Sequence, residues 1–128
     1  MNIICRDLED FKKLYDRKII QSAMLLGDSF SSTDFVMDSY KNIINEIDIS
    51  CMTIKSFPKN ELLEINKLHN KFSQNLSFTD CSILLLAINS GGYVLSNENI
   101  IARICAMYQI VTYTTENYSL NIKLKKTG

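Results

Sequence analysis

A buried helix with an acidic first turn, followed by a short strand and a second acid, restricts the fold more than any other feature. Residues 77–87 read SFTDCSILLLA, with Ser77 as a helix N-cap and Asp80 three residues later, a variant of the capping box. Because the rest of this segment is almost wholly apolar, we expect the helix to be buried. Two glycines end the helix, residues 93–95 then form a buried strand, and Glu98 follows that strand.

These acids fall where a parallel sheet places its binding sites, outside the carboxyl ends of the strands. Glu98 lies just past such an end, and Asp80 reaches the same edge if its helix begins beside it. Asp7 follows a first apolar strand at residues 2–5 and joins the same group. Mg²⁺ prefers oxygen ligands, and two or three convergent carboxylates can hold it against a phosphate. The pattern therefore indicates a divalent-cation site, and the alternative is that the three acids only cap helices and stabilise helix dipoles.

Short β-rich segments alternate with amphipathic segments along the chain. We expect strands near residues 2–5, 29–32, 50–56, 93–96 and 110–113, and helices over 8–26, 35–44, 59–71, 78–90 and from 97 to about 108. This alternation predicts the α/β class, a three-layer α/β/α domain with a mainly parallel central sheet. Residues 1–128 form one domain in this interpretation. The tail from about residue 114 is the least regular part, and residues 118–124 alternate in a way that suits an edge strand.

Composition excludes several classes of protein. The 14 basic and 14 acidic side chains cancel, so a strongly basic nucleic-acid binder is not indicated. The four cysteines form no C-x-x-C pair, which argues against a zinc site and for a reduced, cytoplasmic protein. The longest apolar run, residues 83–88, is too short to cross a bilayer, and no secretory signal is present. His69, the single histidine, has no evident partner for nucleophilic catalysis.

Four segments resemble the acidic motifs of the PIN domain, a metal-dependent nuclease fold found in many bacterial toxin–antitoxin ribonucleases. Residues 3–7 (IICRD) look like the first strand and its terminal aspartate. Residues 32–39 (STDFVMDS) look like the segment that leads into the second acidic position. Residues 78–87 are similar to the third motif, and residues 92–101 resemble the strand, hydroxyl and acid of the fourth. The likeness extends over most of residues 1–113.

The resemblance implies a function and a set of site residues. Asp7, Asp80 and Glu98 would be catalytic and would bind Mg²⁺ or Mn²⁺. Ser96 would position a ligand or phosphate by hydrogen bonding. The substrate implied is RNA, and the partners implied are an antitoxin protein and a second copy of the chain.

The chain departs from the family pattern at three places. The second acidic position aligns with Ser39, which carries no carboxylate, so that Asp38 or Glu9 would have to supply one in an active enzyme. Leu8 and Glu9 stand where the family has a hydroxyl residue and asparagine. The fourth acid is glutamate, at position 98, instead of aspartate. The acidic site is therefore incomplete, and the metal would be absent if the remaining residues do not hold it.

Three hypotheses follow. The first is an active Mg²⁺- or Mn²⁺-dependent endoribonuclease, including the toxin of a toxin–antitoxin pair. The second is a PIN-like protein with impaired catalysis that binds RNA or a protein partner. The third is a small α/β interaction domain whose acids only cap helices. Metal binding by Asp7, Asp80 and Glu98 separates the first two, and convergence of these carboxylates separates both from the third.

Overall fold

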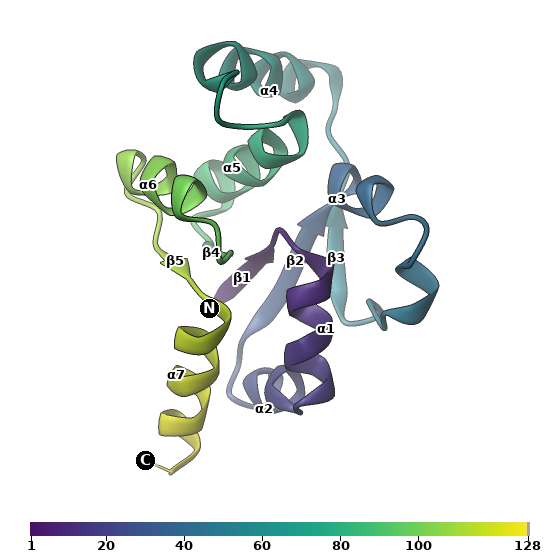
Figure 1. The fold of residues 1–128 in the computed structure, drawn as a ribbon, viewed down its shortest axis with the longest axis vertical. Helices are drawn as coiled ribbons and strands as arrows, with labels where there is room; N and C mark the ends of the chain where they lie inside the picture. The colour runs from purple at the N-terminus through teal and green to yellow at the C-terminus, as the bar shows by residue number, and fades with distance from the viewer. Residues whose placement is uncertain (128) are drawn as a thin grey trace.

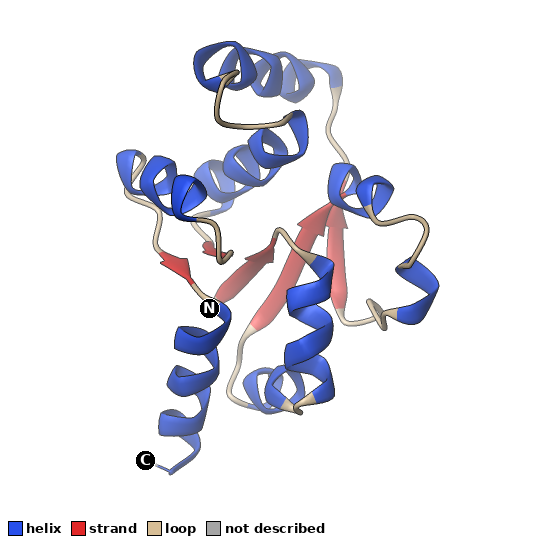
Figure 2. Ribbon diagram, viewed as in Figure 1, coloured by secondary structure: helices blue, strands red, loops and turns tan. Residues whose placement is uncertain are grey.

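The computed structural model describes residues 1–127, which form a five-stranded, fully parallel sheet with helices on both faces (Figures 1 and 2). The strands are β1 (Asn2–Cys5), β2 (Ser29–Thr33), β3 (Met52–Lys55), β4 (Tyr93–Leu95) and β5 (Thr112–Tyr113). The helices are α1 (Leu8–Asp16), α2 (Ile19–Leu25), α3 (Asp34–Ser39), α4 (Lys59–Phe72), α5 (Phe78–Ser90), α6 (Asn99–Met107) and α7 (Thr115–Thr127). The predicted α/β class and parallel sheet are confirmed.

The first strand lies in the middle of the sheet, whose order is β3-β2-β1-β4-β5. Ile3 is in register with Phe30 of β2 on one side and with Tyr93 of β4 on the other. Ile3 and Ile4 are both completely buried, which shows that helices cover both faces of β1. None of the helices in residues 1–127 has the length and apolar character needed to cross a membrane.

Aromatic packing builds the core on one face of the sheet. Phe30 of β2 lies edge-on to Phe11 of α1 and to Tyr118 of α7, with ring centroids 5.9 Å and 6.2 Å away. On the opposite face α5 packs against the sheet through a nearly continuous apolar surface that includes Cys81, Ile83 and Leu84. This burial explains why α5 reads as apolar on every side in the sequence.

The amino end of the sheet carries a closed ionic cluster around Asp28. The N-terminal ammonium of Met1 lies 3.0 Å from Asp28 Oδ1, and the Tyr118 hydroxyl donates to Asp28 Oδ2 at 2.7 Å. The Asp28 side chain is 4% exposed. Burial, and then the hydrogen bond to Asp28, raise the pKa of Tyr118, so its hydroxyl remains a proton donor. The cluster ties α7 to the start of β1.

Three predicted elements differ from the observed ones. The segment 8–26 is two helices, because Lys18 adopts a left-handed conformation (φ 66°) between α1 and α2. The helix predicted over 35–44 ends at Ser39, and turns and a short 3₁₀ helix (Ile44–Glu46) follow it. The edge strand suggested for 118–124 is wrong.

That last segment belongs to α7. Tyr118 and Ile122, four residues apart, are both completely buried, as expected for one face of a helix. The hydroxyl of Thr114 accepts the backbone N–H of Asn117 and so stabilises the first turn. The helical period therefore accounts for the apolar residues that alternation had suggested.

Candidate functional site

A polar cleft lies where β1 and β2 end and α5 begins. Its volume is about 500 Å³, and it is lined by Arg6, Ser39, Tyr40, Ser77, Thr79 and Asp80. An adjoining cavity shares Ser39 and Thr79 with this cleft and extends along α3 to Asp34, Phe35 and Asp38. The cleft is at the carboxyl edge of the sheet, where a parallel α/β domain places its ligands.

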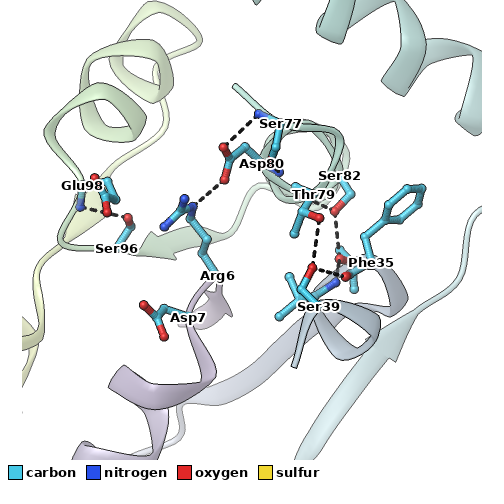
Figure 3. Close-up of polar contacts among 12 residues, drawn as sticks. Arg6, Asp7, Phe35, Ser39, Ser77, Thr79, Asp80, Ser82, Ser96 and Glu98 are labelled. Carbon is cyan, nitrogen blue, oxygen red and sulfur yellow. Dashed lines mark hydrogen bonds and ion pairs between the residues drawn. The ribbon is translucent and has the colours of Figure 1, made fainter. Parts of the chain in front are cut away.

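Asp80 is held firmly in the wall of the cleft. The predicted capping box is present, since Ser77 Oγ accepts the Asp80 N–H at 3.1 Å and Asp80 Oδ2 accepts the Ser77 N–H at 3.0 Å. The other oxygen, Oδ1, accepts a hydrogen bond from Arg6 Nε at 2.6 Å, which is also an ion pair. The Asp80 side chain is 10% exposed and that of Arg6 is 23% exposed. Both carboxylate oxygens of Asp80 thus have partners in the protein (Figure 3).

Asp7 has a different surrounding, although it directly follows Arg6. It is the N-cap of α1, with Oδ1 accepting the Glu9 N–H at 2.9 Å and the Tyr40 hydroxyl at 2.9 Å. Burial, followed by the hydrogen bond to Asp7, raises the pKa of Tyr40, so this hydroxyl stays protonated and donates. Figure 3 shows Arg6, and not Asp7, reaching toward Asp80. The residue after β1 whose side chain meets Asp80 is therefore basic.

Glu98 lies on the other side of the Arg6 guanidinium (Figure 3). It is exposed, and its backbone N–H donates to the buried Ser96 hydroxyl at 3.1 Å. Glu98 itself is the N-cap residue of α6, without a side-chain capping bond. The helix predicted to begin at residue 97 therefore begins two residues later, at Asn99.

Among the supporting residues inferred from the sequence, Ser39 lines the cleft and Asp38 lines the adjoining cavity, whereas Glu9 and Ser96 line neither. Ser39 donates its hydroxyl to the backbone carbonyl of Phe35 at 3.0 Å and lies 3.3 Å from Thr79 Oγ1. Because the Ser39 proton is used in this way, Thr79 is the donor between the two hydroxyls. Asp38 is exposed and lines the adjoining cavity, and Glu9 is exposed in the first turn of α1. Ser39 therefore bridges α3 to α5 and contributes no charge.

The residues of the cleft do not fit a magnesium ion in this arrangement. Within residues 1–127 no group of three acid, histidine or cysteine side chains is placed to hold a metal ion. Asp7, Asp80 and Glu98 therefore do not form a set of metal ligands in this arrangement, although Asp80 and Glu98 lie on either side of the Arg6 guanidinium (Figure 3). Asp7 and Asp80 are engaged by hydrogen-bond donors, and one of those donors is a cation. The catalytic roles of the three acids remain a prediction.

Asn97 and Asp10, which the sequence analysis did not select, also shape this region. Asn97 donates from Nδ2 to Asp10 and to the Thr115 hydroxyl, and accepts the Thr115 N–H on Oδ1 at 2.9 Å. It thereby joins the β4–α6 connection to the first turns of α1 and α7. Burial, and then the charge of Asp7, raise the pKa of Asp10. The signal available in the sequence was an asparagine between a hydroxyl residue and an acid just after a strand.

Nucleophilic catalysis by cysteine or histidine finds no support here. Burial raises the pKa of the Cys81 thiol to about 11, and the Asp80 carboxylate adds to this shift, so the thiol is protonated at neutral pH. His69 lies on α4 and stacks on Phe78, with ring centroids 3.8 Å apart and an interplanar angle of 15°. The Phe78 side chain, next to the cleft residues Ser77 and Thr79, is 45% exposed.

Comparison with known proteins supports the fold. No family model matches the sequence, and no curated protein matches it. Among solved structures, the PilT N-terminus (PIN) domain protein SSO1118 from the hyperthermophilic archaeon Sulfolobus solfataricus P2 is 11% identical, with a TM-score of 0.65, covering 95% of this chain and 93% of that chain. The protein PAE2754 from Pyrobaculum aerophilum is 12% identical, with a TM-score of 0.67, covering 96% of this chain and 95% of that one. At these identities the likeness shows the fold alone, and this fold is PIN-like.

Proposed function

We propose that this chain is a PIN-like protein of the cytoplasm that binds single-stranded RNA in the cleft and does not cleave it by a metal-dependent mechanism. The observation that carries the proposal is the 2.6 Å ion pair between Arg6 and Asp80. It places a protein cation against the acid that would otherwise be offered to a metal ion. Ser39 leaves a further position of the cleft without charge.

The chemistry of phosphodiester cleavage explains how the chain could bind RNA without cleaving it. A bound Mg²⁺ or Mn²⁺ ion would activate a water molecule and stabilise the leaving oxygen. The Arg6 guanidinium neutralises charge and donates hydrogen bonds, but it does not lower the pKa of a water molecule enough to make that water a nucleophile at neutral pH. The chain can therefore keep the surface of the fold while lacking its hydrolytic step.

The exposed Phe78 ring supports RNA as the ligand. Successive bases of a single strand stack on aromatic side chains, each with about 1–3 kcal/mol. Phe78 is preorganised for this contact because His69 supports its other face. The hydroxyls of Ser77 and Thr79, on either side of Phe78 in the chain, line the adjacent cleft.

Binding of a fluorescent single-stranded RNA pool in chelator, followed by fluorescence anisotropy, tests this function. Phe78→Ala should weaken binding by about 5- to 150-fold, which is the change in affinity that corresponds to a lost stacking contact of about 1–3 kcal/mol. Leu63→Ala is the matched control, because Leu63 is an exposed apolar side chain on α4, 54% exposed, that lines neither cavity. Absence of RNA binding by the wild type would contradict the proposal.

A second candidate is the Mg²⁺- or Mn²⁺-dependent endoribonuclease, including a toxin regulated by an antitoxin and acting as a homodimer. The partial exposure of Arg6 favours it, because an exposed side chain can leave Asp80 when a metal arrives. Incubation of the RNA pool with manganese, with and without chelator, tests this candidate. Manganese-dependent cleavage that is abolished by Asp80→Asn would establish it and overturn the binding-only function.

A further inference from the structure

We propose that Arg6, and not Asp7, occupies the position after β1 that decides whether the cleft can hold a divalent cation, and that a single Arg6→Asp substitution creates a cation site beside Asp80. The proposal rests on the proposed function, because it explains the poor fit to metal by one basic side chain. It also reassigns the first acidic position suggested by the sequence, which was Asp7.

The directions of the two side chains carry the first step. Arg6 and Asp7 leave the end of β1 in succession, and Asp7 still has an extended backbone (φ −118°, ψ 112°). Arg6 points to Asp80, whereas Asp7 points to the start of α1 and to Tyr40. Arg6 is therefore the residue after β1 whose side chain faces Asp80 (Figure 3).

The length of the side chain carries the second step. Nε of Arg6 lies 2.6 Å from Asp80 Oδ1, and Nε is one bond farther along its side chain than a carboxylate oxygen of aspartate would be. The carboxylate oxygen of an aspartate at position 6, in the same rotamer, would therefore lie about one bond length farther from Asp80 Oδ1 than Arg6 Nε does. A Mg²⁺ ion with metal–oxygen bonds of about 2.0–2.1 Å fits between two carboxylates at such a separation.

The charges carry the third step. Arg6→Asp removes one positive charge from the cleft and adds one negative charge next to Asp80. Glu98 lies on the far side of the same space, exposed to solvent (Figure 3). Protein sites for Mg²⁺ usually supply one or two carboxylates, while water molecules and substrate phosphates occupy the other positions around the ion. Thus position 6 decides whether the cleft repels or attracts a divalent cation.

Binding of manganese in the absence of RNA tests the proposal. The amplitude of the electron paramagnetic resonance signal of free Mn²⁺ gives the bound fraction, and isothermal titration calorimetry gives the affinity. Arg6→Asp should bind Mn²⁺ at least about ten-fold more tightly than the wild type, as expected for gain of a carboxylate ligand. Arg6→Asn is the matched control, because it opens the same space without a charge, and it should gain much less.

Two double variants identify the ligands. Asp80→Asn in the Arg6→Asp background should remove the gain in Mn²⁺ affinity. Asp7→Asn in the same background should preserve most of that gain, because Asp7 is turned toward α1. Equal Mn²⁺ binding by Arg6→Asp and Arg6→Asn, or loss of the gain with Asp7→Asn, would overturn the proposal.

Circular dichroism with and without manganese monitors folding of every variant, and Arg6→Glu provides a second acid of longer reach. Failure of both acidic variants to fold in manganese would also overturn the proposal. The outcome is independent of the RNA experiments, which use the wild-type cleft. A chain that binds no RNA but gains Mn²⁺ binding with Arg6→Asp would contradict the proposed function and support the assignment of position 6.

Discussion

Two aspartates occupy similar ionic clusters at opposite ends of the sheet. Asp28, at the amino end, binds the Met1 ammonium at 3.0 Å and the Tyr118 hydroxyl at 2.7 Å. Asp80, at the carboxyl end, binds Arg6 at 2.6 Å and the Ser77 N–H at 3.0 Å. The side chains are 4% and 10% exposed.

The clusters differ in what lies beyond them. Tyr118 of α7 closes the space over Asp28, whereas Asp80 and Arg6 line a cleft of about 500 Å³. A carboxylate that binds one cation and one further hydrogen-bond donor therefore stabilises the fold where a helix covers it, as at Asp28. The same chemistry is accessible to a ligand where the wall of a cleft exposes it. This comparison predicts a larger loss of stability at Asp28 than at Asp80.

The largest effect is expected from Asp28→Ala. The substitution leaves a partly buried ammonium and a buried tyrosine hydroxyl without their acceptor, so the free energy of unfolding should fall by about 3 kcal/mol. Urea denaturation measures this value. Asp16→Ala, which breaks the exposed pair between Lys12 and Asp16, is the control and should change stability by less than about 1 kcal/mol. Equal effects of the two substitutions would show that the Asp28 cluster is not structural.

Asp80→Ala should cost less, about 2 kcal/mol, because it removes the reciprocal capping bond and the ion pair while Arg6 can turn to solvent. Ser77→Ala, which removes only the cap, should cost about 1 kcal/mol. The same urea series yields both values. A loss at Asp80 larger than at Asp28 would break the comparison of the closed and open clusters.

Asp10→Asn should give a smaller effect, a modest gain in stability at pH 7, because burial and the Asp7 charge raise the pKa of Asp10. The folded state binds the Asp10 proton more tightly than the unfolded state, whose pKa is about 3.9. Wild-type stability therefore falls as pH rises from that value through the folded pKa. Thermal unfolding of both proteins between pH 4 and 7 should show the gain growing with pH, and a constant difference would contradict this origin.

Lys18→Gly should give the smallest effect, a gain of about 0.5 kcal/mol, because glycine adopts the left-handed conformation between α1 and α2 without strain. Lys13→Gly, inside α1, should instead destabilise by about 1 kcal/mol. Melting temperatures of the two variants provide the measurement. A loss with Lys18→Gly would mean that the lysine side chain itself stabilises the junction.

Local signals explain which elements could be predicted from the sequence. The strands and α5 could be predicted from the pattern of apolar residues and from the Ser77–Asp80 capping box. Both signals depend only on residues that are close together in the chain. The break at Lys18 carries no glycine or proline, so nothing in the residues marks it. The tail was misassigned because Tyr118 and Ile122 satisfy both a spacing of two and a spacing of four.

The candidate site could be predicted in its position but not in its chemistry. Asp80 and Glu98 do lie at the carboxyl edge of the sheet, as their places after a cap and a strand indicated. Which of two consecutive residues after β1 enters the cleft depends on where α1 begins. Because both faces of β1 are buried, the sequence pattern of the strand does not distinguish them. Arg6 was therefore overlooked beside an acid that serves as a helix cap.

The central place of β1 also affects how the chain assembles as it is synthesised. Residues 2–5 are synthesised before the other strands of the sheet and can pair with β2 soon afterwards, but their other edge remains unpaired until β4, at residues 93–95, has been made. Until then an apolar strand has an open row of backbone donors and acceptors, a surface on which other chains can add. Ribosome-bound fragments that end before residue 93 should therefore depend on chaperones more than longer ones.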